Sequence, residues 1–367
     1  MKKILFIVLI MTSMHLHAQA LKTKNVIVIT IDGFRWQEVF TGADNQLLND
    51  KAYVGNPDAL KKKYWNDDPA ERRKLLLPFF WSTIANQGVI AGNRLKDSYV
   101  NVKNPYWFSY PGYNEIFTGF PDPAVNSNEF GPNPNVNILE VINQSKDFAG
   151  KVAVFSSWGA FPNILNDKRS GIFVDAAFQN NPLTGLSPQF DILHTVQNQL
   201  PDVLDGSRLD AVTFNLGFEY LKIKRPRVIY FAFDETDDFA HGGRYEYYLN
   251  AAHYTDNFIN ELWQWVQSQD DYKDKTTLLI SVDHGRGEGI FWKDHGSKIE
   301  HSSETWFAIL GPDTGSTGEA TSGQYYNAQY AQTIATLLGI NFDNNHPKEP
   351  AITEIFKNKQ HLISIQK

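Results

Sequence analysis

Four short runs of apolar, mainly β-branched residues recur along the chain, and their length is typical of buried strands. Between them lie longer segments in which apolar residues return every three or four positions, which predicts helices with one buried face. Near-continuous apolar runs indicate strands that are covered on both faces of a parallel sheet. The predicted strands are 25–31, 151–155, 227–233 and 277–282. The predicted helices are 77–87, 137–144, 188–205, 209–222, 245–267 and 325–338.

The alternation of strands and helices predicts the fold class. It favours an α/β fold, a three-layer sandwich with a mostly parallel central sheet and helices on both faces. Residues 41–73 are polar, rich in Asn, Asp and Lys, and lack strong periodicity. We therefore expect inserted loops or a small cap there, near the mouth of any site. No internal repeat, low-complexity run or Pro/Gly/Ser-rich linker divides residues 21–367, which indicates one large domain.

The first residues follow a different pattern from the rest. Lys2 and Lys3 precede an apolar run over 4–10, and Ala-Gln-Ala at 18–20 resembles a small-residue cleavage sequence. We predict that residues 1–20 are a secretory signal peptide and that the protein is secreted or periplasmic. This run is too short to span a bilayer of about 30 Å, and no later segment offers roughly 20 uninterrupted apolar residues, so no transmembrane segment is expected.

Composition and charge narrow the range of partners. The chain contains no cysteine, so its fold rests on its core, and on any metal ions that it binds, instead of on disulfides. The formal net charge is -7, and removal of a signal peptide with two lysines and no acid would make it -9. Binding to a phosphate backbone requires a basic face, so a nucleic-acid polymer is not an expected partner.

The candidate chemistry follows three of the predicted strands directly. Ligands bind at the carboxyl ends of strands in open α/β sheets, and acids and imidazoles that converge there predict a cation site. Each motif alone more often has a structural role; an Asp-Gly pair after a strand, for example, usually forms a turn. The hypothesis of a cation site therefore depends on the three motifs together. The motifs are Asp32-Gly33, Asp234 with Asp237 to His241, and Asp283-His284-Gly285.

The stretch WFSYPGYNEIFTG, residues 107–119, offers a nucleophile. Ser109 stands two residues before Pro111, and Pro is favoured in the first turn of a helix. Ser109 would then lie at a helix N-terminus, where backbone N–H groups and the helix dipole favour an anion. A serine at such a position is most often only the helix cap, so its role as a nucleophile depends on the neighbouring cation site.

Together these motifs resemble the alkaline phosphatase superfamily, and most closely its nucleotide pyrophosphatase/phosphodiesterase branch. They occur in the order of that family from residue 25 to about 340, and this order is more specific than any single motif. Further similarity lies in residues 306–312 and in the helical segment 331–339. The resemblance implies that residues 21–367 form one metallohydrolase domain. The matching pieces are Asp32-Gly33-Phe34-Arg35, the Ser109 segment ending in Phe117-Thr118-Gly119, Asp237 with His241, Asp283-His284-Gly285 and His295-Gly296.

This resemblance implies a phosphoric ester hydrolase, either a phosphodiesterase or a phosphatase, with two divalent metal ions. Zn²⁺ is favoured because it accepts imidazole nitrogen and carboxylate oxygen, although such mixed sites also accept other divalent ions. One ion would be held by Asp237, His241 and His295. The other would be held by Asp32, Asp283, His284 and the oxygen of Ser109.

Two of these assignments have rivals nearby in the sequence. The rivals are Asp234 and Asp238 for Asp237, and His301 for His295. The spacing of four residues to His241 favours Asp237, although Asp234 is closer to the strand. The following Gly296 favours His295.

The implied mechanism is an attack by Ser109 on the phosphorus of a small-molecule phosphoester, which gives a phosphoseryl intermediate. Related enzymes place an asparagine about 20 residues after the nucleophile, so we expect Asn128, at a spacing of 19, to bind the phosphoryl oxygens. Asn126 is the alternative, and an asparagine in a polar turn is nearly as common an explanation for either residue.

Several residues depart from the family pattern or have two possible roles. Many relatives use threonine where this chain has Ser109, so diester and monoester substrates both remain open. A sulfatase would have arginine where Tyr113 stands, which disfavours that alternative. Arg35 and Arg286 adjoin the motifs and either brace loops through salt bridges or reach substrate. The aromatic residues near the nucleophile either stack on substrate or pack internally; they are Trp36, Tyr106, Trp107, Tyr110 and Tyr113.

Two further alternatives come from other functional classes. A phosphomutase-type relative would share the metal site, but its cytosolic sugar-phosphate substrates do not suit a signal peptide. A non-catalytic secreted binding protein could retain the same fold. The complete set of candidate ligands argues against that alternative, because a lapsed enzyme tolerates the loss of at least one.

Overall fold

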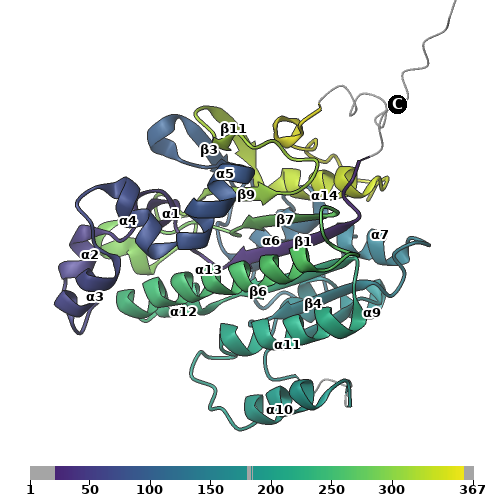
Figure 1. Cartoon of the computed structure of the whole chain (residues 1–367), viewed down its shortest axis with the longest axis horizontal. Coiled ribbons are helices and arrows are strands. Elements are labelled where there is room, and N and C mark those ends of the chain that lie inside the picture. The colour runs from purple at the N-terminus through teal and green to yellow at the C-terminus, as the bar shows by residue number, and fades with distance from the viewer. Residues whose placement is uncertain (1–20, 180–182, 184, 359–367) are drawn as a thin grey trace, which may run out of the picture.

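An eight-stranded sheet organises the part of the chain that the structure describes (Figure 1). The computed structural model describes residues 21–179, 183 and 185–358, so the predicted signal peptide, residues 1–20, lies outside the described residues. The strands of this sheet are β1 (Asn25–Ile31), β2 (Val89–Ala91), β4 (Val152–Ser156), β5 (Phe173–Ala176), β6 (Val228–Phe233), β7 (Thr276–Ser281), β9 (Phe307–Leu310) and β10 (Gly318–Glu319). Their spatial order is β10-β2-β9-β7-β1-β6-β4-β5.

The four predicted strands form the centre of this sheet as β7, β1, β6 and β4, and each differs from its predicted bounds by at most one residue. All neighbouring pairs among them are parallel, with Val26 of β1 opposite Val228 of β6 and Thr277 of β7. Every residue of these strands is buried, as expected for strands covered on both faces. Only β9 runs antiparallel to its neighbours in the large sheet, β7 and β2, among the described pairings.

Helices cover both faces of the sheet, as the predicted fold class requires. Ile27 and Ile29 of β1 pack into a core with α11 and α13, whereas Val26 and Val28 pack into a second core with α6, α7 and α14. The helices are α1 (Trp36–Thr41), α2 (Asn45–Asn49), α3 (Pro57–Tyr64), α4 (Pro69–Leu76), α5 (Ala85–Gln87), α6 (Ser109–Thr118), α7 (Ile138–Gln144), α8 (Phe161–Ile164), α9 (Asp167–Ser170), α10 (Pro188–Gln197), α11 (Asp210–Lys224), α12 (Glu235–His241), α13 (Tyr245–Ser268) and α14 (Tyr330–Leu338). None of those that the structure describes is both long and apolar enough to cross a membrane.

Several predicted helices differ from the observed ones. The predicted helix 188–205 ends at Gln197, because Pro201 disfavours helical backbone in the residue before it. Predicted helix 325–338 begins only at Tyr330, because Tyr325 and Tyr326 belong to β11 (Gly323–Tyr326), which pairs with β3 (Ser98–Asn101). That strand pair and β8 (Glu304–Thr305) form a second, smaller sheet. Short 3-10 turns complete the structure: η2 (Arg94–Lys96), η3 (Gly289–Lys293), η4 (Asn327–Gln329) and η5 (Thr353–Ile355).

The polar segment 41–73 contains the short helices α2 and α3 and the start of α4, so the expected insertion is built from helices and not from irregular loops. Asp44, Asn56 and Asp68 are the N-cap residues of α2, α3 and α4, and each side chain accepts a hydrogen bond from a backbone N–H of its helix. The polar composition that suggested a loop therefore belongs to helix caps. Tyr53 in this segment packs on Trp292, with ring centroids 5.5 Å apart.

The predicted helix 77–87 contains a π-helical turn, η1 (Phe80–Ile84), followed by α5. Its start is capped by Asp256 of α13, whose carboxylate accepts hydrogen bonds from the backbone N–H groups of Phe79, at 2.7 Å, and Phe80, at 2.9 Å. Burial raises the pKa of Asp256 to about 7.

The substitution Asp256→Ala is expected to lower the free energy of unfolding by about 2–4 kcal/mol, because it leaves two buried N–H donors without partners. Urea unfolding at one fixed pH measures the loss in each variant. The matched control is Glu261→Ala, which removes an exposed acid from the same helix. Equal losses in the two variants would contradict the capping role.

Candidate metal centre

Three of the central strands bring candidate ligands to one edge of the sheet. Asp32 directly follows β1, Asp283 follows β7 after one residue, and α12 begins one residue after Asp234 at the end of β6. Since β1 lies between β6 and β7, their carboxyl ends adjoin. The loops are joined there by hydrogen bonds from the N–H of Gly33 to Oδ1 of Asp283, at 3.2 Å, and from the hydroxyl of Thr236 to the carbonyl of Asp32, at 2.5 Å.

The first cluster of ligands consists of Asp32, Asp283 and His284, whose side chains are fully buried. Nε2 of His284 lies 3.3 Å from Oδ1 of Asp32 and 3.4 Å from Oδ2 of Asp283. Neither carboxylate oxygen has a hydrogen-bond partner among the described residues. Oγ of Ser109 lies 3.3 Å from the same Nε2 atom. Three side-chain oxygens therefore lie within 3.4 Å of Nε2 of His284, and two of them are buried oxygens that a cation would satisfy.

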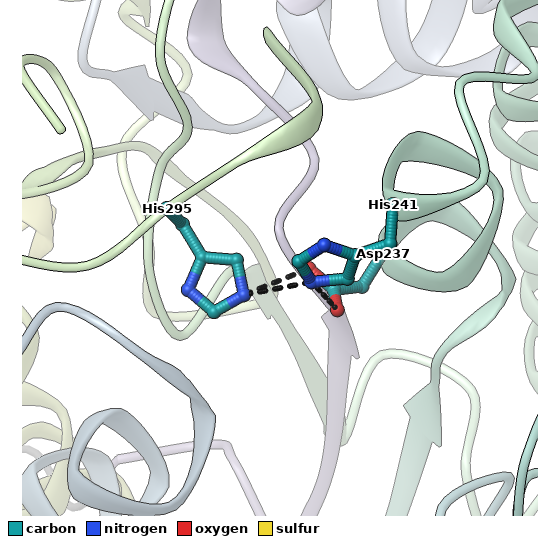
Figure 2. A group of neighbouring side chains, drawn as sticks. All are labelled: Asp237, His241 and His295. Carbon is teal, nitrogen blue, oxygen red and sulfur yellow. Dashed lines mark hydrogen bonds and ion pairs between the residues drawn. The ribbon is translucent and has the colours of Figure 1, made fainter. Parts of the chain in front are cut away.

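The second cluster consists of Asp237, His241 and His295 (Figure 2). Asp237 and His241 are four residues apart on α12, so they share one face of the helix, while His295 comes from the segment after η3. Nε2 of His241 lies 3.1 Å from Oδ2 of Asp237 and 2.9 Å from Nε2 of His295. Figure 2 shows the two imidazole rings directed toward each other beside the carboxylate.

The two clusters form one continuous centre. Nε2 of His284 lies 3.9 Å from Oδ1 of Asp237, which links the first cluster to the second. The rings of His284 and His295 stack with their centroids 4.0 Å apart. The oxygen and nitrogen donors of both clusters are those that Zn²⁺ and similar divalent ions accept.

The electrostatics of the centre also fit a cation. Burial raises the pKa of Asp32 well above its usual range, and the nearby Asp237 raises it further. Burial and the neighbouring Asp32 likewise raise the pKa of Asp283. Burial acts to raise the pKa of Asp237 too, but the Arg286 guanidinium and two histidines outweigh it and hold that pKa well below its usual range. Buried carboxylates at such close range favour a cation among them.

The structure leaves the rival residues outside both clusters. Oδ2 of Asp234 accepts a hydrogen bond from the hydroxyl of Ser207, and Nδ1 of His301 lies 3.0 Å from Oε1 of Glu304. Asp238 follows Asp237 on α12 but belongs to neither group of candidate ligands among the described residues.

Ser109 is the first residue of α6, and its side chain is buried. Gly112 brings this helix close to the metal centre, since a Cβ there would lie only 2.5 Å from the carbonyl oxygen of Asp283. Asn128 is exposed, and its Oδ1 accepts a hydrogen bond from the N–H of Tyr110, at 2.9 Å. The side chain of Asn128 therefore lies at the first turn of the helix that carries Ser109.

Two further residues contact the candidate ligands. Tyr113 was assigned no such role from sequence, and for Arg286 loop bracing through salt bridges was one of two alternatives. The Tyr113 hydroxyl donates to Oδ2 of Asp32 at 2.8 Å, and its spacing of four residues from Ser109 on one helix could have indicated this face. Arg286 is fully buried and donates to Oδ1 of Asp237. Its Nε also donates to the carbonyl of Trp292 at 3.0 Å, so Arg286 links the two segments that carry the second cluster.

The structure also bears on the alternatives for Arg35 and for the nearby aromatic residues. Arg35 pairs with Glu38 and donates to the carbonyl of Gly287 at 3.0 Å, which confirms a bracing role. Of the aromatic residues near Ser109, Trp36, Tyr110 and Tyr113 are buried and pack internally. Tyr106 and Trp107 are half-buried.

Gly33 permits the close contact between the strand ends. Its φ of 56° lies in the left-handed region, and a Cβ would lie 2.7 Å from Oδ1 of Asp237. The substitution Gly33→Ala is expected to weaken zinc binding by about 10- to 100-fold, because it displaces a candidate ligand. Competition with a chromogenic chelator measures this affinity.

The matched control is Gly339→Ala, at a φ of 66° with no atom within 4 Å of the added Cβ. It carries the same backbone strain, of about 1–2 kcal/mol, without a collision, so it should leave the zinc affinity unchanged. Equal affinities in the two variants would show that the contact with Asp237 is unimportant.

Comparisons with known proteins identify the family of the chain and agree with its fold. A family model described as type I phosphodiesterase / nucleotide pyrophosphatase matches residues 43–362. The alkaline phosphatase PafA has 10% identity and a TM-score of 0.57, over 92% of this chain and 100% of that one. The phosphonate monoester hydrolase of Agrobacterium radiobacter has 13% identity and a TM-score of 0.58, over 90% and 77%. The lipoteichoic acid synthase LtaP from Listeria monocytogenes has 13% identity and a TM-score of 0.55, over 88% and 73%. No curated protein sequence matches the chain.

Proposed function

Because the chain belongs to the type I phosphodiesterase / nucleotide pyrophosphatase family, we propose that this phosphoric ester hydrolase forms a phosphoseryl intermediate on Ser109 at a two-zinc centre. The observation that carries the proposal is the position of the Ser109 hydroxyl. Its Oγ lies at the start of α6 and 3.3 Å from Nε2 of His284, beside two buried carboxylate oxygens without hydrogen-bond partners. A nucleophile, candidate metal ligands and an anion-favouring helix end thus meet at one point.

The residues present fit two divalent ions. Asp237, His241 and His295 would hold one, and Asp32, Asp283, His284 and Oγ of Ser109 would hold the other. When bound, zinc ions lower the pKa of a coordinated hydroxyl and stabilise the charge that develops on the leaving oxygen.

The chain's own groups then have distinct roles. Oγ of Ser109 attacks phosphorus and the P–O bond to the leaving group breaks. The hydroxyl proton passes by way of solvent to the leaving oxygen, which departs as an alcohol. Water next hydrolyses the phosphoseryl ester and restores the serine hydroxyl. The first N–H groups of α6 and its dipole stabilise negative charge on the phosphoryl oxygens.

Asn128 is proposed to bind the same phosphoryl oxygens. Its Oδ1 already accepts the N–H of Tyr110, so the Nδ2 group of the same amide is left to donate to an anion at the start of α6. This arrangement favours Asn128 over Asn126.

Tyr113 and Arg286 are proposed to fix the ligands in their orientations. Each donates to a carboxylate oxygen, Tyr113 to Asp32 and Arg286 to Asp237. Nδ1 of His284 lies 2.8 Å from the carbonyl of Gly285, and a proton there leaves Nε2 free as a ligand.

The proposed substrate is a small-molecule phosphoester, and the proposed location is outside the cytoplasm because of the N-terminal sequence. Tyr113 occupies the position at which a sulfatase would have arginine, and it binds Asp32 instead. This contact supports phosphoester over sulfate ester hydrolysis.

Removal of the nucleophile tests the mechanism directly. Ser109→Ala is expected to lower kcat by about 10³-fold or more on the preferred substrate while zinc stays bound. Ser109→Thr is the matched control, because it keeps a hydroxyl and should retain measurable turnover. Hydrolysis of a bis-aryl phosphate diester, an aryl phosphate monoester and an aryl sulfate is compared for each protein.

Faster diester than monoester cleavage identifies a phosphodiesterase, and the reverse order identifies a phosphatase. Faster sulfate cleavage would favour the sulfatase alternative. Zinc-bound protein that turns over none of the three, with or without Ser109, would contradict the hydrolase proposal and favour a binding role.

Metal removal is a separate test. Dialysis against a chelator is expected to abolish turnover, because zinc is proposed to activate the Ser109 hydroxyl and to stabilise the leaving oxygen. Two equivalents of Zn²⁺ per chain should restore turnover. Metal analysis alongside the activity assay relates turnover to occupancy. Full turnover in metal-free protein would contradict the two-zinc centre, and recovery with Mn²⁺ alone would contradict the choice of zinc.

A further inference from the structure

A cationic pocket lies at the edge of the sheet opposite the metal centre. Its volume is about 330 Å³. Five cationic side chains and one carboxylate line it: Lys24, Lys151, Arg225, Arg227, Lys275 and Asp271. These charges give the lining a net charge of +4 in a chain whose formal net charge is -7. A concentration of positive charge against the overall balance of the chain favours an anion.

The pocket is far from the metal centre because it lies where the central strands begin. Lys24, Lys151, Arg227 and Lys275 are the residues directly before β1, β4, β6 and β7. These strands run in parallel from the pocket toward the metal centre. The seven residues of β1 span about 23 Å at the usual rise per residue. An anion in this pocket would therefore not contact Ser109 or the metal ligands.

Most of the positive charge in the pocket has no carboxylate partner in the described part of the chain. Among the described residues, no ion pair of 4.0 Å or less joins any of the five cations to a carboxylate. Nζ of Lys151 donates to the carbonyl of Asp147 at 3.2 Å, and Nζ of Lys275 donates to the carbonyl of Asp270 at 2.9 Å. By contrast, the buried Arg286 of the metal centre faces a carboxylate.

The two guanidinium groups are held in place before any ligand arrives. Arg227 packs over the ring of Phe148 at 4.5 Å, and its Nε donates to the carbonyl of Lys24 at 2.6 Å. Arg225 packs over the ring of Trp265 at 4.9 Å. Ordering these side chains in advance lowers the entropy lost on binding, and the planar fork of arginine matches phosphate oxygens.

Stabilisation of a helix dipole explains only part of this cluster. Arg225 follows the last residue of α11, and its Nε donates to the carbonyl of Lys222 at 3.1 Å, as expected for a cation at a helix C-terminus. Lys24, Lys151 and Lys275 precede strands, so this explanation does not cover them.

We propose that this pocket binds a compact polyanion with two or more neighbouring phosphate groups, either free or on a lipid headgroup. The pocket volume is at the lower end of the range for small-molecule sites, which suits a compact ligand. The site is independent of the metal centre, so the proposal does not rest on hydrolysis.

The test uses the zinc-loaded chain with Ser109→Ala, which prevents turnover of the probe. Calorimetric titration measures the affinity for inorganic tripolyphosphate of this protein and of a variant that also carries Lys151→Gln and Lys275→Gln, the pocket pair. The matched control pair is Lys51→Gln and Lys62→Gln, two exposed lysines outside the pocket. Thermal unfolding and zinc content of each protein, measured before and after titration, exclude misfolding and metal loss.

The pocket pair is expected to weaken binding by about tenfold or more, because it removes two charged donors. The control pair should leave the affinity unchanged. Equal weakening in both pairs, or none in the pocket pair, would overturn the proposal. When the pocket pair or the control pair is introduced into a chain that keeps Ser109, its rate of phosphoester hydrolysis should equal that of the unmodified protein.

A second arm identifies the source of the phosphates. Co-sedimentation is measured with neutral vesicles that contain or lack a bisphosphorylated inositol lipid. Sedimentation that requires this lipid and is lost in the pocket pair supports a lipid headgroup. Pocket-dependent binding of tripolyphosphate alone supports a free polyphosphate, and pocket-independent binding of both probes overturns the proposal.

Discussion

The close burial of three carboxylates at one edge of the sheet is the constraint on which the rest of the site depends. Asp32 and Asp283 each hold one oxygen in the interior without a hydrogen-bond partner among the described residues, and Asp237 lies beside them. Burial of uncompensated charge is costly. Arg286 supplies a positive charge that pairs directly with Asp237. Divalent cations would offset the remaining negative charge, so the site is best explained as one built around metal.

The fold supports this arrangement through the direction of its central strands. The four central strands begin among lysines and arginines without ion pairs in the described part of the chain, and they end among carboxylates and imidazoles. Opposite charges therefore lie at opposite ends of these parallel strands. Helix α6 crosses the carboxylate edge, where Gly112 permits a close approach to Asp283 and Tyr113 binds Asp32. The same helix therefore places Ser109 and fixes a candidate ligand.

The sequence predicted those features that depend on local patterns. Long apolar runs located β1, β4, β6 and β7, and the spacing of four residues paired Asp237 with His241. The contact between Arg286 and Asp237 could not be predicted, because it depends on how two strand ends pack together. Capped helices in 41–73 were missed since Asn and Asp are common both in loops and at helix N-termini.

Anomalous X-ray diffraction at the zinc absorption edge, from crystals of the zinc-loaded protein, tests the central claim most directly. The account predicts two peaks about 4 Å apart. One should lie among Asp32, Asp283 and His284, and the other among Asp237, His241 and His295. A single peak, or peaks away from these residues, would contradict a two-metal centre and require a different explanation for the buried carboxylates.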